Sequence, residues 1–135
     1  MTQVWERLFI GGIADAEELA GGNPFDITTV VSLSEIPVGT RRRGINYLRI
    51  RIEDDEPVPV HQFDAIMDGL YENIRWGRVL LHCSQGINRA PSLAAAYMDA
   101  CGYKSIDDAI KEIRNVCPFI DPSTVLVESL KENLK

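Results

Sequence analysis

The chain has 135 residues, a length that buries one sizeable core and not two. Hydrophobic residues make up 45% and charged residues 25%, as in a globular protein, and no apolar run approaches the roughly 18 residues that cross a bilayer. The net charge of −6, from 14 basic and 20 acidic residues, argues against polyanionic partners. We therefore expect a single domain over residues 1–135, a monomer with no nucleic-acid or membrane partner.

The cysteines and histidines limit the redox compartment and the metal chemistry. Cys83, Cys101 and Cys117 form no C-x-x-C pair, and the first residues lack the basic and apolar regions of a signal peptide. We therefore expect a cytoplasmic protein without disulfides. His61 and His82 are the only histidines and have no ligand spacing, so we expect no metal and no other cofactor.

The first half of the chain predicts three strands and one short helix. A β-branched run predicts a buried strand, and a later run in which every second residue is apolar predicts a half-exposed strand near a sheet edge. The expected elements are a strand over residues 4–10 that Gly11 and Gly12 close, a helix over residues 13–20, a strand over residues 27–33 and a strand over residues 46–52.

The second half predicts four helices and one strand. Apolar residues recur at helical spacing from Phe63 to Ile74, with Gly77 as the expected C-terminal stop, and again from about Arg89 to Cys101. The other expected elements are a strand over residues 78–82, a helix that Ser105 caps and that runs through Arg114, and a last helix with Asp121 as N-cap and Pro122 at its first position. This alternation predicts an α/β fold with a central mixed, largely parallel sheet of four to five strands flanked by helices.

The segment that carries chemistry is a strand, then Cys83-x5-Arg89, then a helix. The strand delivers Cys83 to the carboxyl edge of the sheet, and the loop amides and the helix N-terminus together form an anion site. Gly86 permits a tight bend, and the Arg89 fork matches two phosphate oxygens. The same field stabilises a thiolate, so Cys83 is expected to be an ionised nucleophile. The side chain of His82 points to the opposite face of the strand, so we expect it to support the loop backbone and not to contact the sulfur.

The run His82-Cys83-Ser84-Gln85-Gly86-Ile87-Asn88-Arg89-Ala90-Pro91-Ser92 resembles the H-C-x-x-G-x-x-R-S-x-[ST] signature of cysteine-dependent protein phosphatases, and is most similar to the small dual-specificity branch. The resemblance extends over nearly the whole chain. It implies a protein-tyrosine phosphatase-like fold and metal-free hydrolysis of phosphotyrosine, and of phosphoserine or phosphothreonine, in proteins through a phosphocysteine intermediate. It also implies that the phosphate lies against the loop residues Ser84, Gln85, Gly86, Ile87 and Asn88 and the side chain of Arg89.

The general acid should be a carboxyl group on a loop at the same sheet edge. Alignment with the family places it at Asp54, and Asp55 is the adjacent rival. Two residues depart from the family pattern. Ala90 stands where the family has a hydroxyl that helps the thiol leave, which predicts slow breakdown of the phosphocysteine, and Cys117 stands where the family often has arginine.

Three other interpretations stay open. The chain could act on a non-protein phosphate, such as a nucleotide, an RNA 5′ end or a sugar, or it could bind phosphate without turnover. The basic run Arg41-Arg42-Arg43 is either a solvated turn or a rim that attracts acidic phosphopeptides.

Overall fold

A computed structural model describes all residues from 1 to 135. Its five strands form one sheet in the order β1-β2-β5-β3-β4. The strands are β1 (Thr2–Trp5), β2 (Leu8–Gly11), β3 (Ile27–Ser32), β4 (Asn46–Arg49) and β5 (Arg78–His82). Only β1 pairs antiparallel, and the other pairs are parallel, so the predicted mixed, largely parallel sheet is confirmed.

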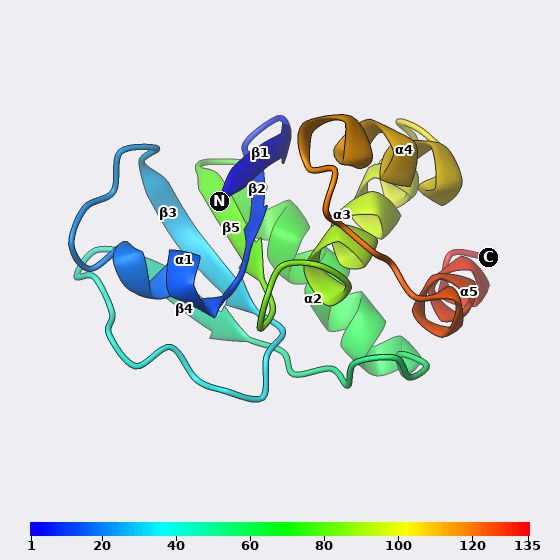
Figure 1. Cartoon of the computed structure of the whole chain (residues 1–135), viewed down its shortest axis with the longest axis horizontal. Coiled ribbons are helices and arrows are strands. Elements are labelled where there is room, and N and C mark those ends of the chain that lie inside the picture. Colours follow the sequence, from blue (N-terminus) through cyan, green and yellow to red (C-terminus); the bar gives the residue numbers. More distant parts are fainter.

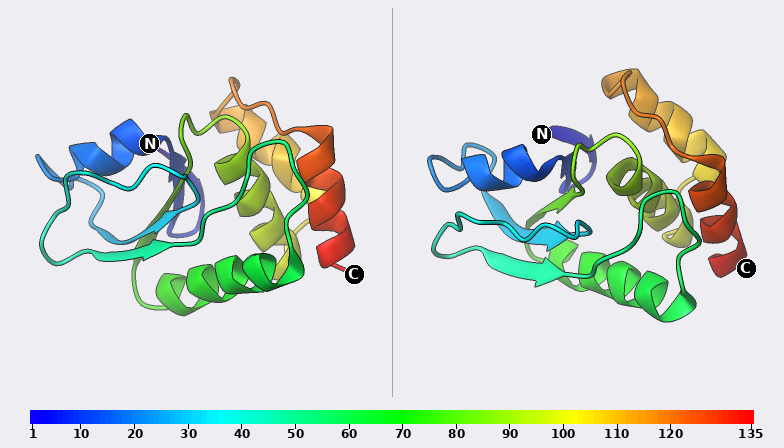
Figure 2. Two further views of the ribbon diagram at one scale, coloured as in Figure 1. Left: turned by 90° about the horizontal axis from the view of Figure 1, so that it is seen from below. Right: turned by 60° about the horizontal axis from the view of Figure 1, so that its bottom comes forward.

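Helices cover both faces of this sheet (Figures 1 and 2). They are α1 (Ile13–Glu18), α2 (Val60–Ile74), α3 (Arg89–Ala100), α4 (Ile106–Val116) and α5 (Thr124–Asn133). The short α1 lies alone on one face, over a cluster of seven buried residues, and the other helices pack on the opposite face around a core of 29 buried residues. None of the helices is long and apolar enough to cross a membrane.

The predicted strand over residues 4–10 is wrong, because this segment is a hairpin of β1 and β2. The chain reverses at Arg7, which adopts a left-handed conformation with φ of 59°. The guanidinium of Arg7 donates to the carbonyls of Ile74 and Arg75 at the end of α2, 3.1 Å from each. These carbonyls have no partner within the helix, and a cation there is favourable.

Two predicted helix ends also differ. Gly77 does not stop α2 through a left-handed conformation; a Cβ at that position would lie 1.9 Å from Thr28 Oγ1, so glycine is needed for close packing. The N-cap of α5 is Ser123 and not Asp121, because the Ser123 hydroxyl accepts from the amide of Leu126. The prediction that Ser105 caps α4 is confirmed by its bond from the amide of Asp108.

The parallel strands place three loops at one edge of the sheet. Because β3, β4 and β5 run the same way, the residues that follow them meet there. Residues 33–35 follow β3, residues 50–55 follow β4 after its pairing ends at Arg49, and residues 83–88 follow β5. The predicted position of β4 at a sheet edge is confirmed.

Candidate active site

The loop between β5 and α3, residues 83–88, lies against the turn between β2 and α1. The amide of Cys83 donates to the carbonyl of Gly11 (3.3 Å), and the amide of Ile13 donates to the carbonyl of Ser84 (3.0 Å). The backbone of the loop is therefore held by two hydrogen bonds before any side chain contributes.

Glycines allow the loop and the turn to approach so closely. Gly86 has a φ of +76°, and a Cβ there would lie 2.8 Å from the carbonyl carbon of Gly11. A Cβ on Gly12 would lie 2.8 Å from the carbonyl oxygen of Ser84. The pair Gly11-Gly12, which we expected only to close a strand, thus also shapes the loop.

The sulfur of Cys83 lies inside the curve of this loop and is buried. It accepts from the amide of Gly86 (3.3 Å) and, across the start of α3, from the amide of Ala90 (3.4 Å). Amide donors and a helix N-terminus stabilise negative charge at the sulfur and beside it. The remaining backbone amides of the loop donate to no acceptor in the protein; they are those of Ser84, Gln85, Ile87 and Asn88.

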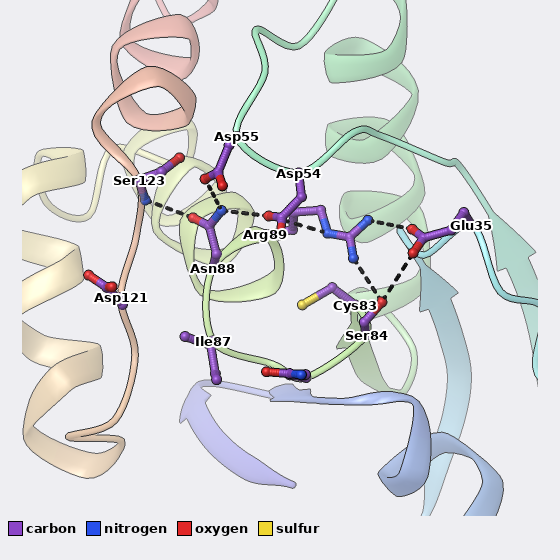
Figure 3. A pocket seen from close by; sticks show the side chains of 11 residues that line it. Glu35, Asp54, Asp55, Cys83, Ser84, Ile87, Asn88, Arg89, Asp121 and Ser123 are labelled. Atoms are coloured by element: carbon purple, nitrogen blue, oxygen red, sulfur yellow. Dashed lines mark hydrogen bonds and ion pairs between the residues drawn. The ribbon is translucent and has the colours of Figure 1, made fainter.

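Arg89 is the first residue of α3, and its guanidinium lies over the pocket (Figure 3). Nη1 donates to Glu35 Oε2 (2.8 Å) and to the carbonyl of Ile52 (3.1 Å), and Nη2 donates to Ser84 Oγ (2.9 Å). Nε lies 3.7 Å from Asp54 Oδ1. The guanidinium is therefore fixed by three segments of the chain.

These contacts change the proton affinity of two groups. The hydrogen bond from Arg89 holds the pKa of Glu35 below its ordinary value. Burial opposes the charge of Arg89, but the hydrogen bond to Glu35 and the charge of that carboxylate outweigh it and raise the pKa of the guanidinium. Both members of the Arg89–Glu35 pair are charged at neutral pH.

The sequence reasoning missed Glu35. It lies three residues beyond β3, at the edge where Cys83 emerges, and that shared edge is the signal that could have found it. Arg49, which we expected only to form an exposed strand face, donates to the carbonyls of Ser34 (3.3 Å) and Glu35 (2.5 Å). Arg49 thus fixes the backbone that carries the carboxylate partner of Arg89.

His82 is fully buried. Its Nδ1 lies 3.2 Å from the carbonyl of Cys83, and its Nε2 lies 2.5 Å from Ser32 Oγ. Because a carbonyl can only accept, Nδ1 carries the proton and the serine hydroxyl donates to Nε2. Burial lowers the pKa of His82, which keeps the ring neutral.

The acidic loop reaches the same pocket through Asn88. Asn88 Nδ2 donates to Asp54 Oδ1 (2.6 Å) and to Asp55 Oδ1 (3.1 Å). Of the two aspartates, Asp54 alone also lies near Arg89. The structure therefore brings both rival carboxyl groups to the loop and places Asp54 beside the guanidinium.

These groups line a single cavity of about 400 Å³. Its lining residues are Glu35, Asp54, Asp55, Cys83, Ser84, Gln85, Ile87, Asn88, Arg89, Asp121 and Ser123. The basic run at residues 41–43 is not part of the lining; Arg41 stacks over the ring of Tyr47, and Arg42 donates to the carbonyl of Leu19. No group of three or more His, Cys, Asp and Glu side chains is placed to hold a metal ion.

Comparison with known proteins decides the family. The model of the dual specificity phosphatase catalytic domain matches residues 8–134. The chain belongs to this family. Rat dual specificity protein phosphatase 18 is 29% identical over 96% of the chain and 65% of the relative, and human dual specificity protein phosphatase 21 is 31% identical over 96% and 69%.

Solved dual specificity phosphatases have the same fold. The structure of DUSP15 superposes with a TM-score of 0.85 at 28% identity, over 99% of this chain and 86% of that one. Human DUSP28 gives 0.86 at 20% identity, over 99% and 95%, which is a likeness of fold. The chain spans 60% of the length of a Dictyostelium discoideum relative and 65% of that of rat dual specificity protein phosphatase 18.

Two positions of this dual specificity phosphatase domain depart from the pattern described above. Ala90 is fully buried, and its backbone amide donates to the Cys83 sulfur. Cys117 is buried in the main core cluster and leaves no cation at its position. The environment of the sulfur therefore lacks the side-chain hydroxyl expected after the arginine.

Proposed function

We propose that the chain is a protein phosphatase that hydrolyses phosphotyrosine, and phosphoserine or phosphothreonine, through a phosphocysteine. The observation that carries this proposal is the Cys83 sulfur, held by two amides inside a loop whose other amides are free and whose open side faces Arg89. This arrangement fits a phosphoryl group bound directly in front of a thiolate.

In the first step the Cys83 thiolate attacks phosphorus, and an S–P bond forms as the bond to the leaving oxygen breaks. The free loop amides and the Nε and Nη2 side of Arg89 hold the three equatorial oxygens as their charge changes. Glu35 and the carbonyl of Ile52 occupy Nη1, so they orient the guanidinium from behind. His82 supports the loop by fixing the carbonyl of Cys83.

We assign the general acid to Asp54. Its carboxyl lies beside Arg89 at the mouth of the pocket, where the leaving oxygen of a bound phosphate monoester would be. It gives its proton to that oxygen and then takes a proton from the water that attacks the phosphocysteine. Asp55 shares the contact with Asn88 but has no contact with Arg89, which favours Asp54.

The proposal is tested by hydrolysis of p-nitrophenyl phosphate in EDTA by the wild type and by Cys83→Ser. Turnover that the substitution abolishes supports a metal-free cysteine enzyme. If neither protein hydrolyses the ester but both bind inorganic phosphate, the chain is a phosphate-binding module.

A second experiment measures the hydrolysis of phenyl phosphate, whose leaving group needs a proton, by Asp54→Asn and Asp55→Asn. We expect a loss of about a hundredfold or more in kcat/KM for Asp54→Asn only.

The class of substrate needs a separate comparison. Relatives named as protein phosphatases favour a phosphorylated protein over a nucleotide, an RNA 5′ end or a sugar phosphate. A panel of these esters beside phosphotyrosine and phosphothreonine peptides ranks them by kcat/KM, and a nucleotide or sugar at the top would overturn the assignment.

We further propose that residues 1–135 act as one catalytic domain, as a monomer, in the cytoplasm, where reducing conditions keep Cys83 from forming a disulfide.

A further inference from the structure

Asn88 stands at the N-cap of α3 but does not cap it. Asparagine is among the residues that most favour this position, where its side-chain oxygen normally accepts from an amide of the first turn. Here no such bond forms. The side chain of Asn88 turns away from its own helix towards two other segments of the chain (Figure 3).

The side-chain amide of Asn88 makes its hydrogen bonds to other segments of the chain. Oδ1 accepts from the amide of Ser123 (2.7 Å), in the segment that leads into α5, while Nδ2 gives one hydrogen to Asp54 and one to Asp55. This pattern fixes the orientation of the amide, because the reverse would set an oxygen against two carboxylates and an NH2 against an N–H donor.

The contact has a consequence for the proton of Asp54. In the protonated state that a general acid needs, the carboxyl oxygen that accepts the N–H at 2.6 Å is the one without the proton, which leaves the acidic proton on Oδ2. No donor of the protein lies within hydrogen-bonding distance of Oδ2. Oδ2 is therefore the oxygen free to give its proton to a leaving group.

We infer that Asn88 is a positioning residue that holds Asp54 by Oδ1 and directs the proton of the general acid to Oδ2. The amide stays on Oδ1 while Oδ2 loses its proton to the leaving oxygen and later regains one from water. The second hydrogen of Nδ2 holds Asp55 and with it the turn of the acidic loop. The bond from Ser123 keeps the amide from rotating.

This inference rests on the proposed function, and it is tested by Asn88→Ala and Asn88→Ser. Serine can still cap α3 and so protects the start of the helix, but it is too short to reach both carboxylates. The readout is kcat/KM, which reports transfer to Cys83, for p-nitrophenyl phosphate and for phenyl phosphate. The first leaving group departs without a proton, and the second needs the acid.

We expect both variants to lose about tenfold in kcat/KM with phenyl phosphate, a part of what general acid catalysis supplies, and to change little with p-nitrophenyl phosphate. In the background of Asp54→Asn, a substitution at Asn88 should cause no further loss with phenyl phosphate, because the two residues act as one unit. Asn88 belongs to the phosphate loop through its backbone amide, which both substitutions retain, so the inhibition constant of inorganic phosphate should change much less than kcat/KM with phenyl phosphate.

Equal losses with the two esters would overturn the inference, because they would show general damage to the loop. Losses that multiply in the double variant would overturn it too, because Asn88 would then act independently of Asp54. Asn115→Ala, at an exposed asparagine of α4, is the matched control and should behave as the wild type. If the wild type hydrolyses neither ester, the proposed function and this inference both fail. If the wild type hydrolyses both esters, the comparison of the variants with it tests the role of Asn88 alone.

Discussion

At the scale of single residues, the site combines one strong cation with groups that hold it still. Arg89 is almost fully buried. Glu35 and the carbonyl of Ile52 accept both hydrogens of Nη1, so the Nε and Nη2 side of the guanidinium is the side available to phosphate. The cysteine, the arginine and the glycine of the loop could be predicted from the sequence, because their spacing is local. Glu35 has no such local signal, because it reaches the loop only through the parallel pairing of β3 with β5 and the sheet edge that these strands share.

Ala90→Ser should speed the second chemical step. A hydroxyl beside the sulfur would donate to the departing thiolate, and a hydrogen bond to a charged group contributes about 1.5 kcal/mol or more, so kcat should rise about tenfold. Rapid-mixing kinetics with p-nitrophenyl phosphate should show a burst in the wild type and a smaller one in the variant, with kcat/KM unchanged. A wild type without a burst would contradict this prediction.

His82 should make stability depend on pH. Its pKa is lowered in the folded protein, so between that value and the ordinary value of about 6.5 the unfolded chain binds a proton that the native chain does not. The free energy of unfolding should therefore fall as the pH falls below about 6.5, by up to about 1.4 kcal/mol per unit from this residue.

Urea unfolding of the wild type, His82→Gln and His61→Gln across this range measures the effect. His82→Gln should flatten the pH dependence, whereas His61→Gln, at an exposed position, should preserve it. Parallel curves for the wild type and His82→Gln would show that this ring does not titrate as we expect.

At the scale of elements, α5 holds the acidic loop in place. Val58 is buried four residues after Asp54, and both of its backbone polar groups bind side chains of α5. Its amide donates to Ser129 Oγ (2.8 Å), and its carbonyl accepts from Asn133 Nδ2 (2.9 Å). The last helix of the chain is thus coupled to the residue that we assign as general acid.

Ser129→Ala should loosen this loop. Leaving the buried amide of Val58 without an acceptor costs about 1–3 kcal/mol of stability. We expect a lower Tm and a loss in kcat/KM of several-fold that is larger for phenyl phosphate than for p-nitrophenyl phosphate. Glu128→Ala on the same helix, whose side chain is exposed, is the control. An unchanged Tm together with an unchanged ratio of the two kcat/KM values would argue against the coupling.

The same scale shows what periodicity alone could predict. The apolar runs placed β3, β5 and α2 to within a few residues, because each of these elements buries a continuous face. The hairpin of β1 and β2 was not predicted, because Arg7 adopts the positive φ of its turn and no glycine marks the turn in the sequence. The start of α5 was misplaced because Ser123, and not Asp121, provides the cap, a choice fixed in part by the contact with Asn88.

At the scale of the whole molecule, the net charge of −6 is reflected at the mouth of the pocket. Glu35, Asp55 and Asp121 all line it, and the only cation among the lining residues is the buried Arg89. The acidic composition therefore does not prevent the binding of one phosphate, which is held by local donors. It does give the mouth of the pocket a negative electrostatic potential, which acts on an approaching peptide.

Phosphotyrosine peptides with lysine or arginine beside the phosphoresidue should have a lower KM than peptides with aspartate or glutamate there. Exposed ion pairs contribute about 1 kcal/mol or less, so we expect a difference of a few-fold per charge. It should shrink as salt is added, because these charges are screened. A preference for acidic peptides would instead favour a role for the run Arg41-Arg42-Arg43.

The central claim is that Cys83 becomes phosphorylated during turnover. Rapid acid quenching of the wild type with an aryl phosphate, followed by mass spectrometry of the peptides, tests it directly. We predict the mass of one added phosphoryl group on the peptide that contains Cys83, absent from Cys83→Ser. Hydrolysis without this adduct under conditions in which a burst is seen, or an adduct on another residue, would contradict the account.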